Sequence, residues 1–142
     1  MAVTAFFYKH AFQLILDGEW KWAQGPVKCM LLDDHVEDLT NDDYVDDVDG
    51  DEISGTGYTA GGKALTTCNI SIAAGVIAFT ADPIEWMASA FTADSCVFYY
   101  DTGDPTTSPL IIHVDFDGDQ TSLGGTFTLT PNASGIGTVT PA

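Results

Sequence analysis

Residues 110–116, with the sequence LIIHVDF, contain the alternation that decides the fold class. The even-numbered positions are all apolar, whereas the odd-numbered positions include His113 and Asp115. Successive side chains of a strand point to opposite faces of its sheet. The stretch therefore predicts a strand of an antiparallel sheet, with the even-numbered face against the core and with His113 and Asp115 on a face open to solvent.

Similar short runs, rich in Val, Ile, Thr, Phe and Tyr, occur along most of the chain and are separated by Gly, Pro, Asp and Asn. About eight strands at this spacing are typical of a sandwich or a barrel. The sequence thus predicts a mainly β protein, built as an antiparallel β-sandwich or partly open barrel. The predicted strands are residues 20–22, 27–32, 65–72, 76–80, 84–88, 95–100, 110–116, 126–130 and 137–140.

One α-helix is predicted at the N-terminus, over about residues 4–17. Thr4 can cap its start, and a glycine after the helix can end it in the left-handed conformation. Apolar residues at helical spacing form one broad face, and Phe6, Phe7 and Leu14 widen this face until it nearly encircles the helix. Such a helix is expected to be buried on two sides, within its own domain or against a neighbouring subunit.

The length of 142 residues predicts a single domain, and a composition that is 45% hydrophobic supplies a core for it. Within residues 1–142, the predicted organisation is the N-terminal helix, an acidic loop over residues 33–52 and a β-rich part over residues 53–142. No apolar run approaches the roughly 18–20 residues that span a bilayer. The N-terminal residues also lack the pattern of a signal peptide. We therefore expect no membrane partner.

The chain carries 21 acidic residues against four lysines and no arginine, so its net charge is −17. The net charge is +1 over residues 1–32, −10 over residues 33–63 and −8 over residues 64–142. Proteins bind nucleic acids with cations that replace the counterions of the phosphates. This composition therefore argues strongly against DNA or RNA as a partner, and it fits a cationic partner, a divalent ion or the solubility of the protein.

The acidic block, residues 33–52, could hold a divalent cation such as calcium, and its candidate ligands are Asp47, Asp49 and Asp51. The spacing of an EF-hand is absent, because Val45 falls at the first ligand position when the loop glycine is aligned. A solvated, self-repelling loop without a cation is the favoured interpretation. No cofactor is predicted.

The sequence contains no motif of a known catalytic or zinc site. Cys29, Cys68 and Cys96 lie far apart in apolar surroundings, which is typical of buried, reduced thiols. His113 and Asp115 share one predicted strand face and could carry acid–base chemistry in a small hydrolase, although an ordinary exposed strand face is the commoner origin of such a pair. We therefore predict a protein that is not an enzyme.

Six segments occur in order along the chain: GEW at residues 18–20, VKCMLL at 27–32, GTGYTAGG at 55–62, YDTGD at 100–104, SPLI at 108–111 and GGTFTL at 124–129. Together they resemble a family of small virion structural proteins of tailed bacteriophages. The resemblance covers nearly the whole chain and implies a head decoration or fibre-associated protein, without transferring any catalytic residue. The dense acidic block and the absence of arginine depart from the family pattern.

The resemblance and the charge together predict a capsid decoration or cement protein, which bridges and stabilises subunits of the major capsid protein. Packaged DNA repels an acidic protein, so the outer surface of the virion head is the expected location, after synthesis in the host cytoplasm. The expected partners are the major capsid protein and copies of the chain itself, in a trimer or another closed oligomer. The alternative is a tail or fibre-associated module that contacts the host surface.

Subunit contacts are expected from the apolar helix and from residues 131–142. Trp20 and Trp22 could instead form a carbohydrate platform with Phe98 and Tyr100. Aromatic side chains are more common in cores and in subunit contacts, which favours those two environments here. The residues predicted to form the interface are Phe6, Phe7, Leu14, Trp20 and Trp22.

Overall fold

The computed structural model describes residues 4–19, 21–132 and 135–139 of the chain. Its helical elements are α1 (Lys9–Leu16) and the 3-10 helices η1 (Trp22–Gln24), η2 (Val45–Asp47) and η3 (Asp49–Asp51). Its strands are β1 (Thr4–Phe7), β2 (Val27–Leu32), β3 (Lys63–Ala64), β4 (Asn69–Ala73), β5 (Val76–Thr80), β6 (Ile84–Tyr100), β7 (Leu110–Leu129) and β8 (Gly137–Val139).

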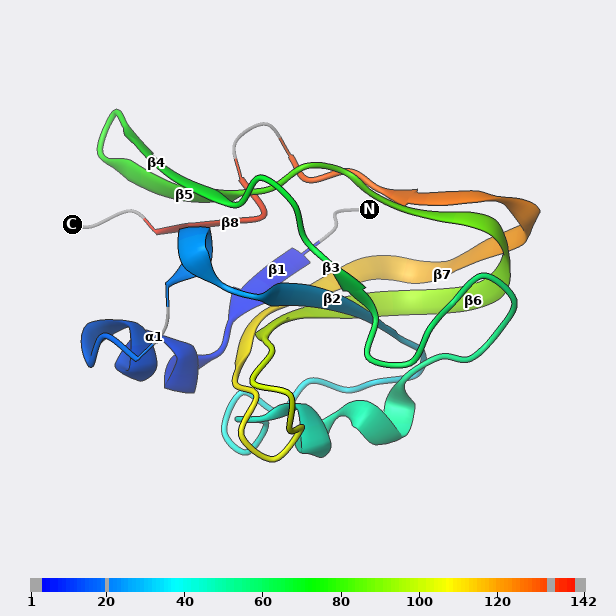
Figure 1. The fold of residues 1–142 in the computed structure, drawn as a ribbon, viewed down its shortest axis with the longest axis horizontal. Coiled ribbons are helices and arrows are strands. Elements are labelled where there is room, and N and C mark those ends of the chain that lie inside the picture. The colour runs from blue at the N-terminus through cyan, green and yellow to red at the C-terminus, as the bar shows by residue number, and fades with distance from the viewer. Residues whose placement is uncertain (1–3, 20, 133–134, 140–142) are drawn as a thin grey trace.

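The strands form two antiparallel sheets, so the predicted mainly β fold class is confirmed. The five-stranded sheet has the order β1-β7-β6-β2-β3, and the three-stranded sheet has the order β4-β5-β8 (Figure 1). β2 and β5 have the bounds that the sequence predicts. The single α-helix of the described residues lies at one end of the five-stranded sheet (Figure 1).

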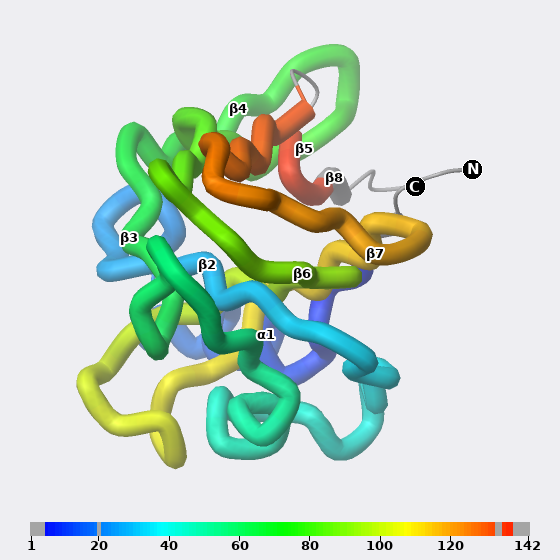
Figure 2. The backbone as a smooth tube through the Cα atoms, turned by 90° about the vertical axis from the view of Figure 1, so that its right-hand side faces the viewer, coloured from blue at the N-terminus to red at the C-terminus, as the bar shows by residue number. Residues whose placement is uncertain are grey.

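β6 and β7 form one long hairpin that bends back over itself (Figure 1). The β6–β7 pairing shifts register between Ala93 and Ser95, and Asp117 on β7 has a φ of 62°. Bulges and left-handed residues of this kind bend a strand. One arm of the hairpin consequently lies beside β2 in the lower layer, and the other arm lies above it in the layer of β4, β5 and β8 (Figures 1 and 2).

The structure has two long, bent strands in this part of the chain, where the sequence predicted four short ones. Residues 84–88 and 95–100 belong to the single strand β6, and residues 110–116 and 126–130 overlap the single strand β7. The polar and glycine-rich stretches between them mark bends rather than turns. A strand can pass through such a stretch because its partner strand bends at the same place and keeps most of the pairing.

The main core fills the space between the two layers. Trp22 lies at its centre, with ring centroids 5.5 Å from Phe79 and 6.4 Å from Phe98. The Trp22 indole N–H donates a hydrogen bond of 3.0 Å to the carbonyl oxygen of Thr80, so its polar atom is satisfied inside the core. Further buried members come from both layers and include Cys29, Leu31, Trp86, Phe91, Cys96, Ile112 and Phe116.

The acidic block covers the opposite face of the five-stranded sheet. Val45 and Val48 are buried there against Met30, Val97 and other residues of β2, β6 and β7. The prediction of a solvated loop was therefore wrong. Two valines among the aspartates supply enough apolar contact to hold η2 and η3 on the sheet. Most of the acidic side chains around them are exposed, whereas Asp42 is buried.

The N-terminal segment corrects the predicted helix. Thr4–Phe7 is strand β1, which pairs with β7 between Thr4 and Asp115 and between Phe7 and Ile112. The α-helix is only Lys9–Leu16, so Thr4 is not its cap. The apolar spacing of residues 4–8 suits either a strand or a helix. A strand forms because it pairs with the edge of β7 and satisfies backbone groups of β7 that a longer N-terminal helix would leave unpaired.

The glycine-rich loop of residues 55–62 lies against strand β6. Gly57 has a φ of 79°, and a Cβ there would lie 2.8 Å from the carbonyl oxygen of Met87. Thr56 forms an antiparallel bridge with Ala90. Glycine is therefore required where this loop lies against β6.

Candidate functional site

An apolar groove of about 560 Å³ lies between α1, η1 and the β4–β5 hairpin. Its apolar lining includes Phe12, Ile15, Leu16, Ile70, Ile77 and Phe79. Leu16 is 85% exposed and Ile72, on the same strand as Ile70, is 75% exposed. Because soluble proteins rarely expose neighbouring large apolar side chains without a use for them, this groove is the best candidate for an interaction surface.

The described lining of the groove contains no acidic residue, although the protein as a whole is strongly acidic. Residues 64–81, which include β4 and β5, contain no charged residue. Among the described residues that line the groove, Lys21 is the one with a charge. The acidic block lies on the other side of the five-stranded sheet (Figures 1 and 2). The molecule thus separates an apolar surface, without acidic residues in its described lining, from an acidic one.

The predicted interface residues have several different environments. Trp22 is 1% exposed in the core, which leaves it no surface for a partner, and Trp20 lies outside the described residues. Phe7 is half-buried, with its ring centroid 5.1 Å from that of Phe12. Phe6 is half-buried on β1 opposite His113. Leu14 is also half-buried and packs against the main core.

Sequence reasoning missed the exposed apolar residues in and beside the groove, which are Leu16, Ile70 and Ile72. The available signal was the run of 18 uncharged residues at 64–81 in a chain with 21 acidic residues. Apolar patterning alone could not identify it, since the same alternation predicts a buried strand face. The position of β4 at the edge of its sheet is what exposes the side chains.

Some carboxylates of the acidic block form hydrogen bonds with other groups of the same block. Asp47 accepts hydrogen bonds from the backbone N–H groups of Asp43 and Tyr44, at 2.9 and 3.0 Å. Asp51 lies 2.8 Å from the Nδ1 atom of His35, and Asp49 is exposed. In the described part of the chain, no group of three or more His, Cys, Asp or Glu residues is placed to hold a metal ion. The three candidate ligands are therefore not brought together.

His113 is buried, contrary to the prediction of an exposed strand face. It is 1% exposed beneath the acidic block, and neither of its ring nitrogens has a hydrogen-bond partner. The ring of His35 lies edge-on to it with the centroids 5.7 Å apart. Burial is the main reason why the pKa of His113 lies below its ordinary value. A substrate in solution has no access to this ring.

Asp115 and the buried His113 do not form an acid–base pair at the surface. Its Oδ1 atom accepts a hydrogen bond of 2.7 Å from the backbone N–H of Asp117. The carboxylate therefore helps to shape the bend of β7, where Asp117 has a left-handed backbone. The pair predicted as a candidate for hydrolysis is thus divided between a buried ring and a bend.

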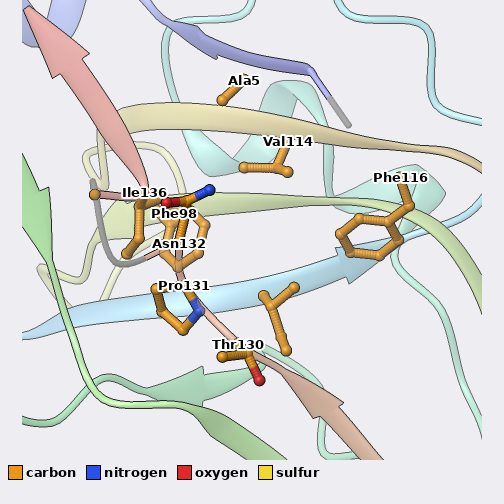
Figure 3. A pocket seen from close by; sticks show the side chains of 10 residues that line it. Ala5, Phe98, Val114, Phe116, Thr130, Pro131, Asn132 and Ile136 are labelled. Carbon is orange, nitrogen blue, oxygen red and sulfur yellow. The ribbon is translucent and has the colours of Figure 1, made fainter. Parts of the chain in front are cut away.

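A second cavity, of about 520 Å³, is lined by residues of β1, β6 and β7 and by residues that follow β7 (Figure 3). β1 pairs with β7 only over residues 112–115, so the space between β1 and the end of β7 stays open. Phe98, Val114, Phe116 and Ile136 give it an apolar lining, with Asn132 near Ile136 (Figure 3). This cavity opens between the two layers on the side of β1.

The cysteines are free thiols, as predicted. Cys29 and Cys96 are buried on neighbouring strands of the five-stranded sheet, and Cys68 is half-buried. Burial raises the pKa of Cys96 and of Cys68, which favours the protonated thiol of both residues at neutral pH.

Comparisons of the chain with protein-family models, with curated proteins and with solved structures found no match. Within the described residues, no helix has the length and apolar character needed to cross a membrane. The function of the chain must therefore be argued from its residues and their geometry.

Proposed function

We propose that the protein is a non-enzymatic structural component of a phage virion, and specifically a decoration protein on the outer surface of the head that bridges subunits of the major capsid protein. One observation carries the proposal. An apolar groove whose described lining contains no acidic residue lies on one side of the five-stranded sheet, and an ordered acidic layer covers the other side.

The groove supplies the contact surface. Leu16 and Ile72 lose contact with water when a partner covers them, and burying apolar area stabilises association by about 25 cal/mol per Å². A single such contact is modest, but a head presents many equivalent sites. Contacts to several capsid subunits and to other copies of the protein then add through avidity.

The acidic layer determines the orientation. Eleven acidic residues lie between residues 33 and 63, and their charge is repelled by packaged DNA. A copy that attaches through the groove keeps this layer toward solvent. The layer then maintains the solubility of the particle, and the protein needs no contact with nucleic acid.

Binding to purified heads that lack the protein tests this function. We expect saturable binding with many copies per head, measured by co-sedimentation, and greater resistance of the decorated heads to heating. Leu16→Lys, at an exposed apolar position of the groove, should weaken this binding. The matched control Val36→Lys, at an 82% exposed apolar position of the acidic block, should bind as the unaltered protein does.

Three results would reject the proposal. The first is the absence of saturable binding to heads. The second is binding confined to tails or fibres, which would favour a host-contact module. The third is an equal loss of binding in the Leu16→Lys and Val36→Lys variants, because the groove would then have no special role.

A further inference from the structure

We propose that β4 pairs with β4 of a second copy of this chain, antiparallel across a two-fold axis, so that two three-stranded sheets become one six-stranded sheet. The inference rests on the proposed function only in taking the groove as the contact surface. It goes beyond that function by naming the strand, the partner and the symmetry.

β4 is an edge strand without the usual protection. It pairs with β5 on one side only, and all five of its residues are exposed. Natural edge strands avoid pairing with other chains by means of charges, prolines or bulges. Asn69–Ala73 contains neither charge nor proline, and its register with β5 is unbroken from Asn69 to Ala73. Its outward N–H and C=O groups are therefore available to another strand.

Other edges of the described residues are less suited to pairing. Residues 120–129, the outer arm of β7, are also uncharged, but their pairing with β6 shifts register near Ser89 and Ala90, and Gly124 has a φ of 96°. Such irregularities interrupt the straight row of groups that a new strand needs. β3 has only two residues, one of which is Lys63. β1 and β8 are also uncharged edges with regular pairing, but they have only four and three residues, and Phe6, Phe7 and Gly137 in them are partly or wholly buried. β4 is the longest uncharged and regularly paired edge of the described residues, and all five of its residues are exposed.

A second copy is the occupant that the charges favour. Two copies, each with a net charge of −17, repel one another wherever acidic residues meet. At the β4–β5 hairpin they can approach without bringing like charges into contact, because residues 64–81 are uncharged. An edge strand also matches itself, since a two-fold rotation brings two identical strands together antiparallel.

The sequence of β4 supports a register centred on Ser71, the middle residue of the strand. Ser71 then lies opposite Ser71 of the other copy, and Ile70 lies opposite Ile72. Ile70 and Ile72 share a face of β4, as alternate residues of a strand do. Both pairs of isoleucines therefore join the two grooves into one continuous apolar surface, which also takes in the exposed Leu16 of each copy.

Sedimentation equilibrium of the purified chain tests the pairing. We expect a dimer, and we expect tighter dimerisation at 1 M salt than at 0.1 M, because salt screens the repulsion of the acidic surfaces. Ile72→Lys should weaken dimerisation roughly tenfold or more, since it places a charge in the new sheet. The matched control Leu123→Lys changes a 90% exposed residue on the outer arm of β7 and should dimerise normally.

A cross-link tests the register. Residues directly opposite one another in an antiparallel pair have Cα atoms about 4.5–5.5 Å apart, which suits a disulfide. A Ser71→Cys, Cys68→Ser variant should therefore form a covalent dimer on mild oxidation. A Leu123→Cys, Cys68→Ser variant should stay monomeric on a denaturing gel.

The two proposals fail in different ways. A chain that remains monomeric at 1 M salt, that forms a trimer, or whose dimer survives Ile72→Lys would overturn the β4 pairing. A monomer that still decorates heads, and loses this binding with Ile72→Lys, would show that β4 meets the capsid protein instead. A β4 dimer that never binds heads would leave the pairing in place and reject the proposed function.

Discussion

The five-stranded sheet and the β4–β5 hairpin are built from similar residues but have opposite surroundings. β2, with the sequence VKCMLL, is buried along nearly its whole length, because the upper layer covers one of its faces and the acidic block covers the other. β4, with the sequence NISIA, is exposed along its whole length. The comparison teaches that what covers a strand, rather than its own alternation, determines whether its apolar side chains form a core or a contact surface.

The largest expected effect is in the core above the five-stranded sheet. Phe98 is 1% exposed and packs near Trp22, so Phe98→Ala removes a buried ring and leaves a cavity. We expect the free energy of unfolding to fall by about 3–5 kcal/mol. Chemical denaturation measures it, with Ile72→Ala on the hairpin as the control. A loss of similar size in both variants would contradict the contrast between the two regions.

The acidic block provides the next test, because the structure makes it a cover for the sheet. Val48 is 1% exposed and contacts the second core, so Val48→Ala should lower the free energy of unfolding by about 1–3 kcal/mol. Val36→Ala, in the same block but exposed, should change it by less than about 0.5 kcal/mol. Equal and small effects in denaturant titrations would mean that the block is a solvated loop.

The buried His113 predicts a smaller, pH-dependent effect under the same block. Burial lowers its pKa, and His35 acts in the same direction, whereas Glu37, Asp94 and Asp115 raise the pKa without reversing the shift. The unfolded chain binds a proton near the ordinary pKa of 6.5, and the folded chain does so only at lower pH. The contribution of His113 to stability is therefore complete above pH 6.5 and decreases as the pH falls below it.

Thermal unfolding between pH 7.5 and 5.5 measures this contribution. A His113→Leu variant removes the titrating ring and the two unpartnered nitrogens, so its melting temperature should depend less on pH than that of the unaltered protein. The same pH dependence in both proteins would show that His113 does not stay neutral in the fold.

The smallest effect is expected on the hairpin itself. Ile72→Lys changes a side chain that is 75% exposed, so the free energy of unfolding of the monomer should change by no more than about 0.5 kcal/mol. Dilute samples keep the protein monomeric during this measurement. A large loss of stability would mean that Ile72 belongs to the core of the chain, and its role in association would then need another explanation.

The sequence predicts the fold class and several elements because local alternation and turn residues carry that information. The bounds of β2 and β5 agree with the prediction, and Gly18, with a φ of 75°, follows the end of α1 as expected. The helix start was wrong, because Thr4–Phe7 pairs with β7, a strand more than 100 residues away. A single sequence does not reveal pairing over such a distance.

The candidate site was predicted only in part for the same reason. The alternation of residues 110–116 indicated one buried face, but it could not show that residues 33–52 would cover the other face and bury His113. Aspartates dominate that block, and the two valines that attach it to the sheet are a weak signal among them. The uncharged run at residues 64–81 was visible in the sequence, whereas its place at a sheet edge was not.

Amide hydrogen exchange, measured on dilute monomeric protein and on protein bound to purified heads, tests most directly whether β4 and the apolar groove make the contacts while the acidic layer faces solvent. We predict that amides of β4 and the C-terminal turn of α1 become protected on binding, and that amides of residues 33–52 exchange at unchanged rates. Protection of residues 33–52 without protection of β4 would contradict the account.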